Sequence, residues 1–182
     1  MPTAETTSVL LNAAEVGREL ERMAREIVDK DAGRVADLAL IGIHTRGVFL
    51  ARRLSDLIAG ITGQAVLTGD IDITLYRDDW TRISYQPVVQ STDISFSVDD
   101  RRVVLVDDVL FTGRTTRAAL DALTDFGRPS RVELAVLVDR GLRELPIRAD
   151  YVGKSVATRR SQTVNVMLSE CDDQDLVVVA GE

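Results

Sequence analysis

The sequence predicts an α/β domain with a mostly parallel sheet, because short apolar runs alternate along the chain with stretches of helical periodicity. The apolar runs are unbroken and rich in β-branched residues, which is typical of strands that are buried on both faces. A length of 182 residues indicates one domain. We therefore expect a single domain over residues 1–182, in which residues 1–9 form a loose tail.

The first half of the chain begins with a predicted helix. Periodicity starts after Asn12 and places four apolar residues on one face, namely Val16, Leu20, Met23 and Ile27. Gly33 ends this segment. The elements expected after it are a buried strand over residues 38–43, a helix with its apolar set between residues 48 and 58, a strand candidate within residues 65–75, and an irregular polar segment over residues 76–91.

The second half continues the alternation of strands and helices. Its clearest strand prediction is the unbroken β-branched run over residues 103–106. The elements expected after it are a helix over residues 115–126 that ends at Gly127 and Pro129, a buried strand over residues 134–138, a charged irregular segment over residues 139–150, and two late strands over residues 164–168 and 176–179.

Composition excludes several classes of protein. The formal net charge of −7 excludes a generally basic nucleic-acid coat, although it leaves room for a local basic patch. The single cysteine, Cys171, excludes an internal disulfide framework, and the single histidine, His44, excludes a multi-histidine metal centre. No apolar run approaches the ~18 residues of a membrane span, and the start of the chain lacks the pattern of a signal peptide. We expect a cytoplasmic protein with no membrane partner and no metal site built from protein side chains alone.

The most informative segment runs from Val103 to Thr116 and contains a buried strand, two carboxylates, a turn and the start of a helix. Ligands of open α/β sheets bind at the carboxyl ends of strands. The backbone N–H groups of the turn, the hydroxyls of Thr112 and Thr115 and the helix N-terminus predict a cradle for an anion. Asp107 and Asp108 would repel a phosphate, but they can accept hydrogen bonds from ribose hydroxyls. A pair of Asp residues is also common where a helix starts, but the whole run favours a site for a ribose 5-phosphate.

This segment resembles the motif with which type I phosphoribosyltransferases bind 5-phosphoribosyl 1-pyrophosphate (PRPP). Segments 72–79, 127–129 and 138–150 are similar to one branch of that family, the pyrimidine operon attenuation regulators, which are also uracil phosphoribosyltransferases. The resemblance covers about residues 10–180. It implies the type I phosphoribosyltransferase fold, which is a mostly parallel sheet flanked by helices with a small hood.

The resemblance also implies a set of PRPP-binding residues. Residues 44–47 match the pyrophosphate loop of the family, in which Thr45 and Gly47 let the backbone approach and Arg46 supplies a cation. Arg140 follows a buried strand in the segment that faces the nucleobase, and we expect it to cover the base or the phosphates. The PRPP motif itself comprises Val103, Val104, Leu105, Val106, Asp107, Asp108, Val109, Leu110, Phe111, Thr112, Gly113, Arg114 and Thr115.

The implied reaction joins uracil to the ribose of PRPP and gives UMP and pyrophosphate. Asp107 and Asp108 are the expected catalytic carboxylates, and Arg77 in the segment 76–79, which resembles the flexible catalytic loop, is expected to reach the pyrophosphate. Mg²⁺ is expected to arrive bound to PRPP or pyrophosphate. UMP and UTP are the expected effectors.

The second function implied by the resemblance is binding of the leader RNA of pyrimidine biosynthesis genes. Its contact residues in the family match Arg22, Lys30, Arg143, Arg148, Lys154 and Thr158, and Arg159 and Arg160 add charge nearby. We expect a dimer or a higher homo-oligomer to complete this surface. Three departures from the family pattern, at Glu21, Leu142 and Ala157, concern this surface, whereas the catalytic motifs are intact.

Three hypotheses follow for function. The first is a bifunctional regulator and uracil phosphoribosyltransferase. The second is a salvage phosphoribosyltransferase for another base, such as hypoxanthine, with no role in RNA binding. The third is an RNA-binding regulator with vestigial catalysis. The intact pair Asp107 and Asp108 disfavours the third, and the match over residues 140–150 disfavours the second.

Overall fold

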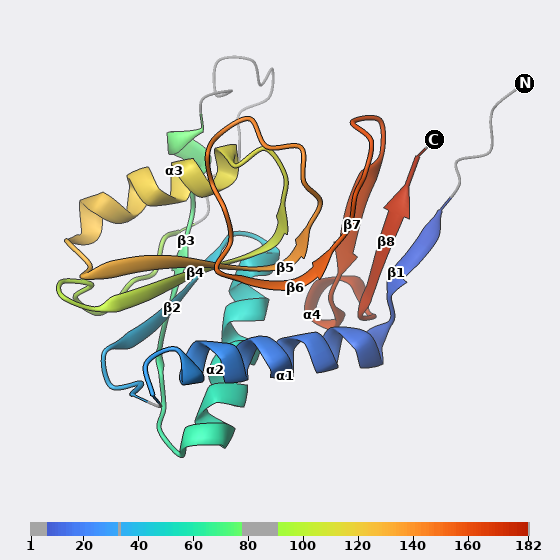
Figure 1. Cartoon of the computed structure of the whole chain (residues 1–182). Helices are drawn as coiled ribbons and strands as arrows, with labels where there is room; N and C mark the ends of the chain where they lie inside the picture. Colours follow the sequence, from blue (N-terminus) through green and yellow to red (C-terminus); the bar gives the residue numbers. More distant parts are fainter. Residues whose placement is uncertain (1–6, 33, 78–90, 182) are drawn as a thin grey trace, which may run out of the picture.

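Two β-sheets organise the molecule. The computed structural model describes residues 7–32, 34–77 and 91–181. A five-stranded parallel sheet has the order β3 (Leu67–Ile71), β2 (Leu38–Ile43), β4 (Arg102–Leu110), β5 (Arg131–Asp139) and β6 (Tyr151–Ser155). A three-stranded antiparallel sheet has the order β1 (Ser8–Leu11), β8 (Leu176–Ala180) and β7 (Thr163–Met167). The smaller sheet stands at the carboxyl end of the larger one, and with the turn between β7 and β8 it forms the hood (Figure 1).

Helices cover both faces of the parallel sheet. Helices α1 (Ala13–Asp29) and α2 (Arg46–Thr62) pack on one face, and α3 (Arg114–Leu123) packs on the other (Figure 1). A buried apolar cluster lies on each face, and the apolar side chains of residues 103–106 in β4 alternate between the two clusters. The short helix α4 (Ser169–Asp172) joins β7 to β8. None of the helices in the described parts of the chain is long and apolar enough to cross a membrane.

Local sequence signals explain where the two long helices start and stop. Asn12 accepts a hydrogen bond from the Glu15 backbone N–H at 3.0 Å, and the Glu15 carboxylate accepts one from the Asn12 N–H at 2.9 Å, so the helix start has reciprocal capping. All four apolar residues predicted for the inner face of α1 are buried. Helix α2 ends at Gly63, which has a φ of 71°, a conformation that glycine adopts without strain.

The predicted α/β class and parallel sheet are confirmed, with three corrections. Ser8 and Val9 belong to β1 and are paired with β8, so they are not part of a loose tail; residues 1–6, like Gly33, lie outside the described residues. Strand β4 runs through Asp107 and Asp108 to Leu110, whereas the sequence predicted that it would stop before them. Strand β6 was not predicted, because only two of its five residues, Tyr151 and Val152, are strongly β-forming.

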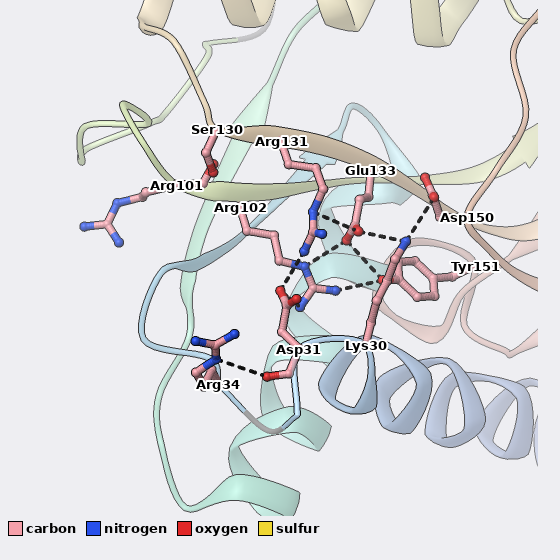
Figure 2. A network of polar contacts seen from close by, with 10 residues as sticks. All are labelled: Lys30, Asp31, Arg34, Arg101, Arg102, Ser130, Arg131, Glu133, Asp150 and Tyr151. Carbon is pink, nitrogen blue, oxygen red and sulfur yellow. Dashed lines mark hydrogen bonds and ion pairs between the residues drawn. The ribbon is translucent and has the colours of Figure 1, made fainter.

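A polar network closes the amino end of the parallel sheet (Figure 2). Glu133 on β5 is 3% exposed and pairs with Lys30 at 2.8 Å, Arg102 at 2.9 Å and Arg131 at 3.2 Å. Arg102 also donates to the Tyr151 hydroxyl at 2.7 Å. The network thereby ties the end of α1 to strands β4, β5 and β6, at the end of the sheet away from the hood.

Candidate active site

A cavity of about 320 Å³ opens at the carboxyl ends of the parallel strands. Segments that follow β2, β3 and β4 line it, as expected for a ligand site in an open α/β sheet. It brings together six residues predicted for the site, namely Thr45, Arg77, Asp107, Asp108, Val109 and Thr115. It also contains His44, from the predicted pyrophosphate loop, and three residues that were not predicted to bind there, namely Asp72, Ile73 and Thr74.

The two carboxylates on β4 differ in their surroundings. Asp107 is 6% exposed, and Asp108 is half-buried. Each accepts a hydrogen bond from the next backbone N–H, Asp107 from Asp108 at 2.9 Å and Asp108 from Val109 at 2.8 Å. Burial, and then the neighbouring charge of Asp108, raise the pKa of Asp107 well above its usual range. The pair therefore combines a buried carboxyl group that resists ionisation with a half-buried one that also lines the cavity.

The turn after β4, for which an anion cradle is predicted, leads directly into α3. Gly113 directly precedes α3 with a φ of 93°, and the Arg114 N–H donates to the Thr112 hydroxyl at 3.3 Å. The side chains of Val103, Val104, Leu105, Val106 and Leu110 are at most 2% exposed. These five apolar side chains, predicted as part of the PRPP motif, therefore support the site from the core and cannot contact a ligand themselves.

The pyrophosphate loop predicted at residues 44–47 lies against the same strand. The peptide bond between His44 and Thr45 is cis. A Cβ atom at Gly47 would lie 2.3 Å from the Val106 carbonyl oxygen, so only glycine allows this approach. His44 lines the cavity, and its Nε2 is buried without a hydrogen-bond partner among the described residues.

Arg46 is directed to the hood and does not line the cavity. Its guanidinium donates to the Asp172 carboxylate from Nε at 3.2 Å and from Nη2 at 2.9 Å. The hydrogen bond to Asp172, outweighing desolvation, raises the pKa of Arg46, and the Asp108 charge adds to this. Arg46 therefore lies within electrostatic reach of the Asp108 carboxylate while it is held by the hood.

Asp72 is the clearest site residue that sequence reasoning missed. It is 9% exposed, lines the cavity and accepts a hydrogen bond from the Thr74 N–H at 2.9 Å. Its signal was available, since it follows a strand directly, as Asp107 was thought to do. Arg77 also lines the cavity, whereas the remainder of the predicted catalytic loop, Asp78 and Asp79, lies outside the described residues.

Arg140 has a different environment from the one predicted. Its guanidinium donates to the Thr158 hydroxyl at 3.0 Å, the Arg159 carbonyl at 3.0 Å and the Gln162 carbonyl at 2.6 Å, and it lies 4.0 Å from the centre of the Phe111 ring. Burial lowers its pKa. Arg140 thus joins the turn after β4 to the loop before β7, and its donors are directed to protein groups.

The residues predicted to bind RNA fall into two groups. Four are engaged within the molecule. Arg22 donates to the Val152 carbonyl at 2.7 Å, Lys30 belongs to the polar network of Figure 2, Arg143 donates to the Phe111 carbonyl at 2.8 Å, and Thr158 binds Arg140. Arg148 and Lys154 are exposed and form no ion pair within the described parts of the chain. Of these six residues, Arg148 and Lys154 therefore have charges that no ion pair within the described residues neutralises, and the same holds for the neighbouring Arg159, whereas Arg160 pairs with Glu144 at 3.1 Å.

Comparison with known proteins agrees with this geometry. Residues 6–173 match the phosphoribosyl transferase domain. The chain is 64% identical over 176 residues to the Bifunctional protein PyrR of Desulfosudis oleivorans, covering 96% of this chain and 97% of that protein. It is 58% identical over 168 residues to the Bifunctional protein PyrR of Thermus thermophilus, covering 92% of each.

The chain belongs to the PyrR family of phosphoribosyltransferases. Solved structures confirm the type I phosphoribosyltransferase fold. A hypoxanthine phosphoribosyltransferase of Trypanosoma cruzi superposes with a TM-score of 0.72 over 96% of this chain and 97% of that chain, at 20% identity. A second structure of the T. cruzi enzyme gives a TM-score of 0.73 at 18% identity, covering 100% of this chain and 94% of that chain. These likenesses show the fold of this PyrR-family chain and do not bear on its nucleobase.

Proposed function

We propose that this protein converts uracil and PRPP to UMP and pyrophosphate, and that it also binds the leader RNA of pyrimidine biosynthesis genes. The observation that carries the catalytic half is the position of Asp107 and Asp108 above a glycine-containing turn, in a cavity at the carboxyl end of the sheet. The regulatory half is supported by the relatives named Bifunctional protein PyrR, which are 52–64% identical to this chain.

The cavity supports the following arrangement of PRPP. The turn over residues 111–115 and the N-terminus of α3 hold the 5-phosphate in this arrangement, because a helix N-terminus attracts anions and Thr115 lines the cavity there. Asp107 and Asp108 bind the ribose hydroxyls. His44, Thr45 and Arg77 line the part of the cavity proposed for the pyrophosphate.

The reaction is a displacement at the ribose C1 atom. A uracil nitrogen forms a bond to C1 and gives up its proton, and the bond from C1 to the pyrophosphate oxygen breaks. Positive charge develops on the ribose ring, and the Asp108 carboxylate is placed to stabilise it. The chain mainly positions the reactants and excludes water. We assign no general base.

Mg²⁺ is the metal that this chemistry uses. The described residues contain no group of three or more His, Cys, Asp or Glu side chains that could hold a metal ion, so the donors would come chiefly from PRPP itself. The cation would neutralise charge on the departing pyrophosphate. Asp107 and Asp108 would contribute by fixing the ribose hydroxyls beside it.

RNA binding is proposed for the surface that contains Arg148 and Lys154, with UMP and UTP as effectors. Exposed cations that have no ion pair within the described residues can bind phosphates without first breaking intramolecular contacts. Arg143, in contrast, would first have to break its hydrogen bonds to four carbonyl groups. A homodimer or higher oligomer, one domain over residues 1–182 and a cytoplasmic setting stay predictions.

A panel of nucleobases tests the catalytic half. We expect pyrophosphate release from PRPP and Mg²⁺ with uracil, and little or none with hypoxanthine or guanine, because the chain is similar to the uracil-specific branch over residues 138–150. Pyrophosphate would be measured by a coupled assay, with the variant Asp107→Asn, Asp108→Asn as the background control. Turnover of a purine without turnover of uracil would contradict the substrate assignment and restore the second hypothesis.

A further inference from the structure

The acidic turn of the hood, residues 169–175, has no role in the function proposed so far. It carries the carboxylates of Glu170, Asp172 and Asp175, and all three bind arginines of α2. These arginines, Arg46 and Arg53, are seven residues apart, so they lie on the same face of the helix. The hood is therefore attached to α2 at two points.

The two arginines are used differently. Arg53 employs its whole guanidinium, since Nε and Nη2 bind Glu170 at 2.8 and 2.6 Å, and Nη1 and Nη2 bind Asp175 at 2.7 and 2.8 Å. It also donates to the Ser169 hydroxyl at 2.9 Å. No edge of this guanidinium is left for a ligand, which makes Arg53 the structural anchor of the hood.

Arg46 is bound along one edge only. Nε and Nη2 donate to Asp172, and Nη1 has no hydrogen bond to the described residues. Asp172 is itself fixed, because its Oδ2 accepts hydrogen bonds from the Leu168 N–H at 3.0 Å and from the Cys171 thiol at 3.1 Å. A fixed carboxylate on the Nε–Nη2 edge holds the plane of the guanidinium and leaves Nη1 available.

The position of Arg46 in the fold indicates what its free Nη1 group can bind. Arg46 is the first residue of α2 and directly follows Thr45, which lines the cavity. The close packing of Gly47 on the Val106 carbonyl fixes the backbone beside it. The helix N-terminus adds its partial positive charge at the same place. A polyanion that enters beside Thr45 would therefore meet a backbone N–H cluster and an oriented cation together.

We propose that Asp172 is a positioning residue for the pyrophosphate group of PRPP, acting through Arg46. Asp172 holds the Nε edge of the guanidinium so that the Nη1 edge can bind a phosphate oxygen while the ion pair to the hood persists. The proposal rests on the proposed PRPP-dependent function. It differs from a competitive role for Asp172, since a carboxylate that competes with phosphate would occupy Nη1, whereas the bonds to Asp172 use Nε and Nη2.

The test compares three variants of the full chain. Asp172→Asn removes the charged, two-point contact with Arg46, Asp172→Glu restores a carboxylate, and Asp175→Asn weakens the hood anchor at Arg53 without touching Arg46. For each, binding of pyrophosphate with Mg²⁺ would be measured by calorimetry, KM for PRPP and for uracil and kcat by steady-state kinetics, and integrity by thermal unfolding.

We expect Asp172→Asn to weaken pyrophosphate binding and to raise KM for PRPP by about tenfold. The reason is that a misaligned Arg46 guanidinium contributes little to binding a phosphate oxygen. The KM for uracil should stay nearly unchanged. Asp172→Glu should recover part of the loss, and Asp175→Asn should lower thermal stability without changing pyrophosphate affinity.

Three results would overturn the inference. Unchanged pyrophosphate affinity in Asp172→Asn would remove the positioning role. Tighter binding in that variant would make Asp172 a competitor. Equal losses in Asp172→Asn and Asp175→Asn would mean that both act only by holding the hood. If the unaltered protein binds neither pyrophosphate nor PRPP, the proposed function itself fails, which is a separate result.

Discussion

At the scale of single residues, the buried carboxyl of Asp107 is unfavourable for the stability of the fold. The side chain is 6% exposed, next to a like charge on Asp108. Burying an ionised carboxylate costs free energy unless a cation or several hydrogen-bond donors compensate for the lost water. Here the Asp108 backbone N–H donates one hydrogen bond to Asp107, which compensates only in part. A residue retained in such a place is typical of a functional site.

Replacing both carboxylates should abolish most of the activity. In Asp107→Asn with Asp108→Asn, the ribose hydroxyls lose their acceptors and the developing positive charge loses its counterion. We expect kcat/KM to fall on the order of 10²-fold or more, which corresponds to roughly 3 kcal/mol of transition-state stabilisation. Steady-state kinetics with uracil and PRPP measure this, and activity near that of the unaltered protein would rule out the assigned role.

The raised pKa of Asp107 makes a separate prediction about stability. The unfolded carboxyl ionises near pH ~4, while the folded one keeps its proton to higher pH, so the free energy of unfolding falls as pH rises through that window. At neutral pH, the free energy of unfolding of Asp107→Asn should therefore exceed that of the unaltered protein, by about 1.4 kcal/mol for each unit by which the pKa of Asp107 is raised. Denaturant unfolding at pH 4 and pH 7 measures this, and the variant should gain stability only at the higher pH. A gain that does not depend on pH would contradict the assignment.

At the scale of elements, strand β6 and the loop before it determine which cationic side chains are accessible to a binding partner. Helix α1 packs against β6, and Arg22 uses part of its charge on the Val152 and Gly153 carbonyls. Arg148 precedes the strand and Lys154 lies within it, and both remain exposed. The strand thus presents two cations on an otherwise acidic molecule.

Neutralising these two cations should separate RNA binding from catalysis. In Arg148→Gln with Lys154→Gln, we expect weaker binding to the leader RNA of the protein's own pyrimidine operon and a flatter salt dependence, by a slope of roughly 0.7 per lost phosphate contact. Uracil turnover should be kept, since neither residue lines the cavity. Filter binding at several salt concentrations measures the effect.

Arg128→Gln is the matched control for that experiment, because it removes one exposed charge from the loop between α3 and β5. It should leave RNA affinity nearly unchanged. Loss of RNA binding and of turnover together in the double variant would show that the two sites cannot be separated. Absence of salt-sensitive binding by the unaltered protein would leave an enzyme without a regulatory role.

At the scale of the whole molecule, the two ends of the parallel sheet have different tasks. The carboxyl end holds the cavity, and ion pairs from α2 fix the hood beside it. The amino end is closed by the network of Glu133, Lys30, Arg102 and Arg131 (Figure 2). Burial raises the pKa of Glu133, but hydrogen bonds from Lys30 and Arg102 outweigh it, so the pKa is lowered overall. Stability and chemistry are thus concentrated at opposite ends.

Removing the shared carboxylate of this network should destabilise the protein without changing its catalysis. In Glu133→Gln, buried Arg102 keeps only part of its counter-charge, and breaking a buried pair typically costs about 3 kcal/mol. Denaturant unfolding measures the loss, and kcat per folded molecule should not change. Asp121→Asn, which breaks an exposed pair with Arg117 on α3, should cost about 0.5 kcal/mol or less. Equal effects of both variants would show that burial does not strengthen the network.

The sequence by itself determined the fold class and the position of the site along the chain. Periodicity placed α1 and α2, and unbroken apolar runs placed β2, β4 and β5, because local patterns record which residues must be buried. The run from Val103 to Thr116 contained the carboxylates and the turn in one continuous segment, so that its chemistry could be read without coordinates.

Only the tertiary structure decided which side chains are free to act. Arg46, Arg140 and Arg143 looked alike in sequence as candidate ligand cations, but their partners come from segments up to 126 residues away, and no local pattern encodes such contacts. The hood also depends on contacts between segments that are far apart in the sequence. β1 and β8 pair although they are at opposite ends of the chain, and that pairing turns an apparent tail into a strand. The charge available at a site depends on long-range packing, whereas the types of residue in it depend on sequence alone.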